Sequence, residues 1–377
     1  MARTNVTETM PSDSMSPGGP EEPGGPGEPA LERRSGAGDL WRGAVRSTNL
    51  YILLVEVGLL ALFSVISPNN HAFFRTNNFI SIVWDSAGTL LLAIGETFVI
   101  ITAGIDLSVG TVLLLAGVVA QWVMAQTGGS PAQVTNGVFP NAGTAIPLGI
   151  LAALAVGAAA GATNGLLIAR LRLPPFIVTL GVFGITNGLG DLLAAAGAAG
   201  QSLIPAAPPA LASSFGSGNV VLGLPALVIA AVVAAVIAHI VLSRTIFGRR
   251  TFAVGSNPEG SRLAGVPVNR QILWVYVLAG VMAAIAGVFD LARYNTIDVS
   301  GYGSENLNAI AAVVIGGTSL FGGTGSITGT VIGAFIPVTL LYGFQIQGIP
   351  SFWQQVAVGI IVIVAVLVDQ VRRRRLT

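Results

Sequence analysis

The chain has 377 residues, of which 53% are hydrophobic and only 9% are charged, and its formal net charge is +1. Because an average soluble domain carries about a quarter charged residues, this composition indicates an integral membrane protein and gives no basic surface for nucleic acid. There is no cysteine, and the two histidines, His71 and His239, lie far apart, so disulfides and thiolate or His-rich metal sites are excluded and we expect no metal and no cofactor.

The first 40 residues differ from the rest of the chain. They are rich in Pro, Gly, Ser and Glu, a composition that cannot bury enough apolar surface to offset the entropy of ordering. They also lack the basic start, apolar core and cleavage site of a secretory signal peptide. We therefore predict a disordered cytoplasmic tail over residues 1–40 and a transmembrane domain over residues 41–371.

The transmembrane domain contains about ten apolar stretches that are long enough to cross a bilayer, at about 20 helical residues for each crossing. The stretches are continuously apolar instead of alternating, which favours helices over the strands of a barrel. We predict an all-α integral membrane protein with spans near residues 49–67, 79–102, 108–126, 146–169, 175–196, 222–243, 271–292, 305–321, 326–345 and 353–371.

Arginine placement orients the predicted helices. With the N-terminus in the cytoplasm, only Arg75 and Arg293 fall outside, which is the positive-inside pattern with both termini cytoplasmic. Residues 372–377 form a basic cytoplasmic tail that anchors the last helix. The arginines on the cytoplasmic side are Arg42, Arg46, Arg170, Arg172, Arg244, Arg249, Arg250, Arg262, Arg270 and Arg372–Arg375.

The motif GIDLSVG, residues 104–110, interrupts a long apolar region. Gly104 allows a turn, Asp106 can cap the next helix by accepting amide hydrogen bonds, and Ser108 can add another cap. A break at membrane depth is tolerated only where it is buried in protein or lines a watery cavity. We interpret Asp106 as a helix cap, and hydropathy leaves open whether it lies at the cytoplasmic rim or deeper.

Glycine and alanine recur three to four residues apart in residues 154–167 and 324–335, which predicts close helix packing.

Packed helices with polar groups inside imply a translocation pathway. A carboxylate in the membrane suggests function, but those at predicted helix ends can reach the interface, namely Glu56, Asp85, Asp290 and Glu305. A polar residue of this kind more often makes a helix contact or a helix cap than it binds a substrate. The pathway candidates are Glu96, Thr97, Thr102, Asp106, Ser108, Asn164, Asn187, Asp191 and Asn308.

The one sizeable cytoplasmic loop, residues 244–270, carries a predicted helix of about two turns. Asn257 is a good N-cap, Pro258 suits the first helical position, Glu259 complements the positive helix end, and Gly265 can end the helix in a left-handed conformation. So short a helix is unstable alone in water, so the membrane surface or a partner protein must hold it. A permease would offer such a helix to a motor subunit.

Four stretches carry a family resemblance: GETFVIITAGIDLSVGT (95–111), ATNGLLIARLRLPPFIVTLG (162–181), GRRTFAVGSNPEGSRLAGVPV (248–268) and NAIAAVVIGGTSLFGGTGSITGTVIGA (308–334). In the same order and spacing they resemble the permease subunits of ribose-type ABC sugar importers, the family that also serves xylose, galactose and arabinose. The related branched-chain amino-acid permeases look less similar, especially at GIDLSVG. The N-terminal tail, Glu96 and Asp191 depart from the family pattern.

The resemblance implies a multi-pass permease of the bacterial inner membrane that translocates a pentose or hexose. It also implies a second permease copy in a homo- or heterodimer, an extracytoplasmic sugar-binding protein, and a separate cytoplasmic ABC ATPase. In that family the loop helix docks into a groove on the ATPase, which assigns coupling here to Asn257, Pro258, Glu259, Arg262, Leu263 and Gly265.

Two other functions stay open. An ion-coupled secondary transporter would use buried Glu96, Asp106 and Asp191, but it has no need of the loop helix. GLGD at 188–191 and PAL at 225–227 match signatures of intramembrane aspartyl proteases, but no Tyr-Asp pair supplies the second aspartate. The chain also has no lysine and no phosphate loop, so we expect no catalytic residue and no ATPase activity of its own.

Overall fold

The computed structural model describes residues 48–67, 73, 75–197, 206–216, 220–221, 224–297 and 302–374. The predicted disordered tail, residues 1–40, lies outside the described residues, and so do the side chains of the terminal arginines, Arg372–Arg375.

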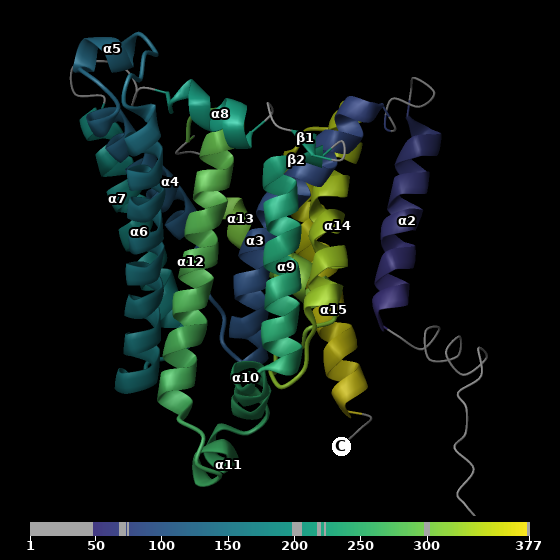
Figure 1. The fold of residues 1–377 in the computed structure, drawn as a ribbon. Helices are drawn as coiled ribbons and strands as arrows, with labels where there is room; N and C mark the ends of the chain where they lie inside the picture. The colour runs from purple at the N-terminus through teal and green to yellow at the C-terminus, as the bar shows by residue number, and fades with distance from the viewer. Residues whose placement is uncertain are drawn as a thin grey trace, which may run out of the picture. The chain divides into compact units, whose positions relative to one another are not determined.

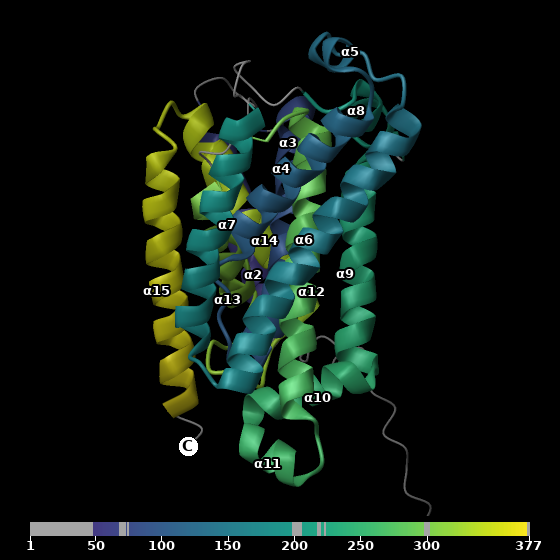
Figure 2. The ribbon, with the colours of Figure 1, turned by 90° about the vertical axis from the view of Figure 1, so that its left-hand side faces the viewer.

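The membrane domain is built from helices (Figures 1 and 2). One pair of two-residue strands, β1 and β2, is antiparallel and precedes α9. In chain order the elements are α2 (Thr48–Ile66), α3 (Thr76–Ile101), α4 (Val109–Thr127), α5 (Pro131–Thr135), α6 (Ala142–Leu171), α7 (Pro175–Gly197), α8 (Pro209–Phe215), β1 (Val220–Val221), β2 (Leu224–Pro225), α9 (Ala226–Arg244), α10 (Ile246–Ser256), α11 (Pro258–Leu263), α12 (Val268–Tyr294), η1 (Tyr302–Ser304), α13 (Glu305–Ile315), α14 (Ile327–Ile346) and α15 (Phe352–Arg374).

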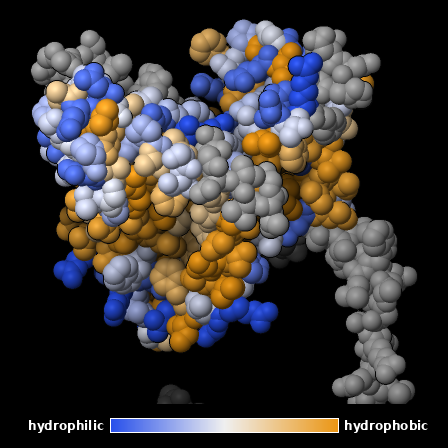
Figure 3. Space-filling view, turned by 45° about the horizontal axis from the view of Figure 1, so that its top comes forward, coloured by the Kyte–Doolittle hydropathy of each residue, from blue (hydrophilic) through white to orange (hydrophobic). Residues whose placement is uncertain are grey.

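Nine of the described helices are long and apolar enough to cross a membrane, which confirms the predicted all-α membrane class. They are α2, α3, α4, α6, α7, α9, α12, α14 and α15. The apolar part of α3 is 83% buried and forms the centre, whereas that of α15 is 11% buried and lies outside. Figure 3 shows hydrophobic residues over the flank of the helices and hydrophilic residues toward both ends, as a bilayer requires.

One predicted span differs from the structure. The sequence predicts a membrane-crossing helix over residues 305–321, but α13 has only 11 residues. Its length of about 16 Å is about half of an apolar core of ~30 Å. The helix ends at a glycine-rich segment, residues 316–326, which we call the glycine turn. Three of its glycines have left-handed backbone angles, with φ between 77° and 85°, which a helix cannot accommodate.

Contacts of the glycine turn show which helix ends lie together. Gly323 donates its amide to the last carbonyl of α3 (2.9 Å), and the Ser319 hydroxyl donates to Asp369 near the end of α15 (2.7 Å). Asn49, at the start of α2, donates to Thr328, at the start of α14 (3.1 Å). The start of α2 and the end of α15 therefore lie on the side that carries α10 and α11 (Figures 1 and 2).

This α10–α11 side is rich in arginine. Arg75 precedes α3 and Arg293 ends α12, so both lie at the opposite side. The distribution matches the predicted grouping of arginines; that the α10–α11 side faces the cytoplasm stays a prediction of the positive-inside rule. The described arginines on the α10–α11 side are Arg170, Arg172, Arg244, Arg249, Arg250, Arg262 and Arg270.

Small residues bring α6 and α12 into contact, as the spacing of glycine in residues 154–167 predicts. A Cβ added at Gly157 would overlap the carbonyl of Gly280, and one at Gly161 would overlap the carbonyl of Tyr276. The second predicted run, residues 324–335, packs α14 against α13 in the same way. Close backbone contact of this kind holds the two helix pairs together without large side chains.

Candidate functional site

The GIDLSVG motif connects α3 to α4, and its aspartate caps the connection. Asp106 Oδ1 accepts hydrogen bonds from the amide and the hydroxyl of Ser108 (2.8 and 2.5 Å). Ser108 itself makes no side-chain cap on α4: its hydroxyl donates to Asp106 and accepts from the Asn164 amide (2.9 Å). The turn predicted at Gly104 is misplaced by one residue: the left-handed residue is Ala103 (φ 60°). Glycine is needed at 104 because the Tyr276 hydroxyl would lie 2.6 Å from a Cβ there.

Asp106 lies inside the protein and not at its rim. Its side chain is 1% exposed, and its second oxygen accepts a hydrogen bond from the Asn164 amide (3.3 Å). Asn164 lies about two turns before the end of α6 at Leu171, which is about 10 Å along the helix axis. The carboxylate is therefore buried at about this depth from the α10–α11 side.

Several other predicted pathway residues bond to neighbouring groups of the protein. The Thr97 hydroxyl shares a hydrogen bond with Thr330 of α14 (2.7 Å), and the Thr102 hydroxyl donates to a carbonyl one turn earlier (2.7 Å). Asn187 donates to Asp191 (3.1 Å), which is exposed on α7. The partner of Asp191 is thus an amide and not the second aspartate that an aspartyl protease needs.

A cavity of about 410 Å³ lies in the half of the membrane domain away from α10 and α11. Its walls come from the middle of α3, the last turns of α12, the start of α13 and parts of α4, α14 and α15. Of the nine predicted pathway residues, only Asn308 lines it. The polar lining residues are Asp85, Thr89, Asp290, Tyr294, Thr296, Tyr302, Glu305, Asn308 and Gln354.

One carboxylate of the cavity is neutralised by an arginine. Asp85 forms an ion pair with Arg293 and accepts hydrogen bonds from the hydroxyls of Tyr294 (2.9 Å) and Tyr342 (2.5 Å). The Arg293 guanidinium also lies over the Trp84 ring, 4.9 Å from its centroid, in cation–π geometry. These contacts join α3, α12 and α14 at one wall of the cavity.

The two other carboxylates form no ion pair in the described part of the chain, although Arg293 lies close enough to Asp290 to attract it. Asp290 accepts a hydrogen bond from the Tyr302 hydroxyl. Glu305 accepts one from Asn308 (3.3 Å), whose amide oxygen accepts from Gln354 (3.2 Å). The cavity therefore holds more carboxyl groups than arginines, together with several donors and acceptors, a lining that suits a polar, hydroxyl-rich molecule better than an anion.

The sequence predicts that the carboxylates of the cavity lie near helix ends, where they would reach the membrane surface. The structure instead gathers Asp85, Asp290 and Glu305, each partly buried, around one cavity. It buries Glu56, which is 6% exposed and bonded to a threonine. A signal was present: Tyr294 follows Asp290 by one helical turn, so both lie on one face of α12. Ionisable residues within membrane helices almost always face the bundle interior or a watery cavity, so this polar face of α12 could have been expected to point inward.

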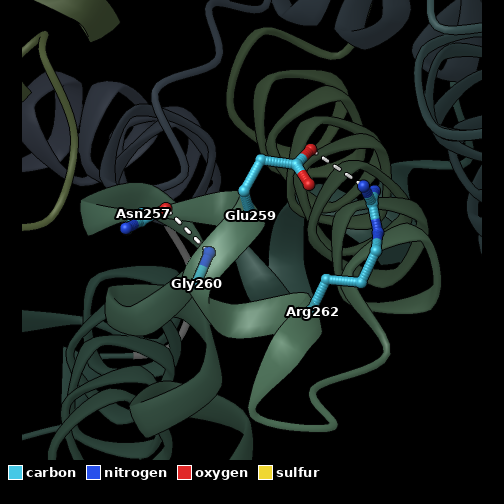
Figure 4. A network of polar contacts seen from close by, with 4 residues as sticks. All are labelled: Asn257, Glu259, Gly260 and Arg262. Carbon is cyan, nitrogen blue, oxygen red and sulfur yellow. Dashed lines mark hydrogen bonds and ion pairs between the residues drawn. The ribbon is translucent and has the colours of Figure 1, made fainter. Parts of the chain in front are cut away.

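The loop between α9 and α12 contains the capped helix that the sequence predicts (Figure 4). Asn257 Oδ1 accepts a hydrogen bond from the Gly260 amide (2.8 Å). Pro258 begins α11, and Gly265 follows the helix with a left-handed φ of 79°. The local signals therefore give both ends of this helix correctly.

The outer face of α11 is available for contact. Glu259 and Arg262 form an exposed ion pair (2.9 Å), and Leu263 is 91% exposed. Behind α11, Gly255 of α10 lies against the last carbonyl of α3. A force on α11 would therefore reach the end of α3 through α10.

These features define a class of protein. The helices cross a membrane, a polar cavity lies within them at one side, and a capped helix is exposed on the other side. This is the architecture of a transport permease.

Comparison with known proteins gives the family. Over residues 78–366 the chain matches the family described as "Branched-chain amino acid transport system / permease component". It is 36% identical to the ribose import permease protein of Escherichia coli (strain K12), over 84% of this chain and 92% of that protein. It is 35% identical to the fructose import permease protein of Rhizobium meliloti, over 84% of each chain. It is also 33% identical to the xylose transport system permease protein of Escherichia coli (strain K12), over 88% of this chain and 94% of that one.

The chain therefore belongs to this family of transport-system permeases, whose members are transport subunits and not enzymes. No solved structure gave a significant match.

Proposed function

We propose that this chain is the membrane-spanning subunit of an ATP-driven importer of a monosaccharide in the bacterial inner membrane. The observation that carries the proposal is the similarity, over most of the chain, to permeases whose names specify ribose, fructose and xylose. The cavity supports it, since carboxylates, amides and tyrosines around about 410 Å³ are groups that bind sugar hydroxyls and rings.

In this proposal an ABC ATPase supplies the energy and the loop helix transmits it. ATP binding closes a pair of ATPases, the motion passes through α11 and α10 to the end of α3, and the cavity opens to an extracytoplasmic binding protein that delivers the sugar. A second permease copy, identical or related, completes the pathway. The coupling contact consists of Asn257, Pro258, Glu259, Arg262, Leu263 and Gly265.

Uptake in proteoliposomes tests the proposal. The permease is reconstituted with its ATPase and its extracytoplasmic binding protein, and entry of labelled ribose, xylose, fructose, galactose and leucine is measured with ATP and with a non-hydrolysable analogue. We expect ATP-dependent uptake of one of the sugars. Uptake of leucine but of no sugar would show that the substrate is an amino acid. Sugar uptake driven by an ion gradient without ATP would favour the secondary transporter.

A further inference from the structure

A second group of polar side chains lies away from the cavity, where the α3–α4 connection meets α6 and α12. Glu96 and Asp106 are 0% and 1% exposed, and their carboxylates lie close enough to repel one another. Tyr276 of α12, also 1% exposed, faces both. Neither carboxylate belongs to an ion pair among the described residues. Two negative charges in such surroundings are unstable unless a positive charge compensates them.

Four oxygen atoms in this group have no hydrogen-bond partner although they are fully buried. They are both carboxylate oxygens of Glu96, the hydroxyl of Tyr276 and the amide oxygen of Asn164. The Tyr276 hydroxyl lies against Gly104, two residues before Asp106, and the Asn164 amide nitrogen contacts Asp106 itself. Buried polar atoms are nearly always paired. Unpaired oxygens gathered around two carboxylates therefore point to a bound ligand that all of them can contact.

We propose that Glu96, Asp106, Tyr276 and Asn164 form an internal binding site for one small monovalent cation, a proton or Na⁺. Carboxylate, hydroxyl and amide oxygens suit either occupant. Asp106 already accepts hydrogen bonds from the amide and hydroxyl of Ser108 and from Asn164, so its charge is stabilised locally. The Glu96 oxygens lie near the Asp106 backbone amide but have no hydrogen bond of normal geometry, so the cation is held chiefly by Glu96.

The position of the site connects its occupancy to transport. The charged group near Glu96 is Asp106. Helix α12 places Tyr276 beside both carboxylates, and α6 places Asn164 beside Asp106. A bound cation lets the connection stay packed against α6 and α12. Its release leaves two repelling carboxylates beside the end of α3, which is the point that α10 touches.

Thermal unfolding of the purified full-length chain in detergent tests the site without any transport partner. The midpoint is measured in NaCl and in choline chloride at equal ionic strength, and then in choline chloride over a rise from mildly acidic to mildly alkaline pH. A ligand held by the folded state alone stabilises it. We expect the midpoint to rise by several degrees with Na⁺ if the occupant is Na⁺, or to fall by several degrees as pH rises if it is a proton.

Three variants assign the response to this site. Glu96→Gln is neutral and has the same shape, so it should stay folded and lose the response. Tyr276→Phe keeps the ring and should weaken the response, which provides a test if the first variant does not fold. Asp191→Asn, which changes an exposed carboxylate, should respond like the wild type. A wild-type midpoint that is insensitive to both Na⁺ and pH, or a full response in both site variants, would overturn the proposal.

Discussion

Leu263, the last residue of α11, gives a quantitative test of the coupling contact. Its side chain is 91% exposed at the end of the otherwise polar sequence PEGSRL, so docking would bury nearly all of it. Leu263→Ala removes three methylene-sized groups at ~0.8 kcal/mol each, so it should weaken ATPase binding by about 2 kcal/mol. That corresponds to a roughly 30-fold higher Kd. Surface plasmon resonance of the ATPase on the permease in nanodiscs measures it.

Leu173 provides the matched control. It lies in the turn between α6 and α7 on the same arginine-rich side, is 42% exposed, and is outside α11. Leu173→Ala should leave the Kd within about twofold of the wild-type value, as surface substitutions away from a contact do. The reasoning is refuted if Leu263→Ala binds the ATPase as tightly as the wild type, or if the control weakens binding equally.

Substitutions at three further positions test the cap, the cavity and the helix break. Asn257→Ala removes the N-cap of α11 at a cost of about 1 kcal/mol, so ATPase binding should fall about fivefold, and Asn257→Asp should restore it in the same binding assay. Glu305→Gln removes a charged acceptor worth about 1.5–3 kcal/mol and should lower sugar uptake tenfold or more, while ATPase binding stays unchanged. Asp106→Asn keeps the oxygen that accepts from Ser108 but sets an amide group beside Asn164. We expect normal assembly, measured by size-exclusion chromatography, and reduced sugar uptake. Normal uptake would mean that Asp106 acts only as a cap.

The elements that could be predicted from the sequence are those whose signals are local. Each continuous apolar run other than 305–321 became a membrane-crossing helix, and the cap and stop residues of α11 act within one turn of the chain. The run 305–321 failed because hydropathy does not register the left-handed glycines that follow Ile315. The cavity could not be found in one stretch, because Asp85, Asp290 and Glu305 come from three helices that meet only in the folded bundle.

The short helix α13 and the glycine turn connect the two functional ends of the molecule. α13 begins at Glu305 in the cavity, and the turn that follows bonds to the end of α3 through the Gly323 amide (2.9 Å). A Cβ at Gly323 would lie 2.5 Å from the Ser256 hydroxyl of α10, and its φ of 77° is left-handed. Alanine there would cost roughly 1–2 kcal/mol in backbone strain and would push α10 away from the turn.

Gly323→Ala should therefore separate ATP hydrolysis from transport. We expect the reconstituted complex to hydrolyse ATP at a rate near that of the wild type while the number of sugars imported per ATP falls severalfold, because the strained turn no longer follows α10. Gly303 lies in η1, just before α13, and a Cβ there meets no atom within 4 Å, so Gly303→Ala should keep the wild-type ratio. A wild-type ratio in Gly323→Ala would contradict this role, because the cavity would then respond to the ATPase through helices other than α13.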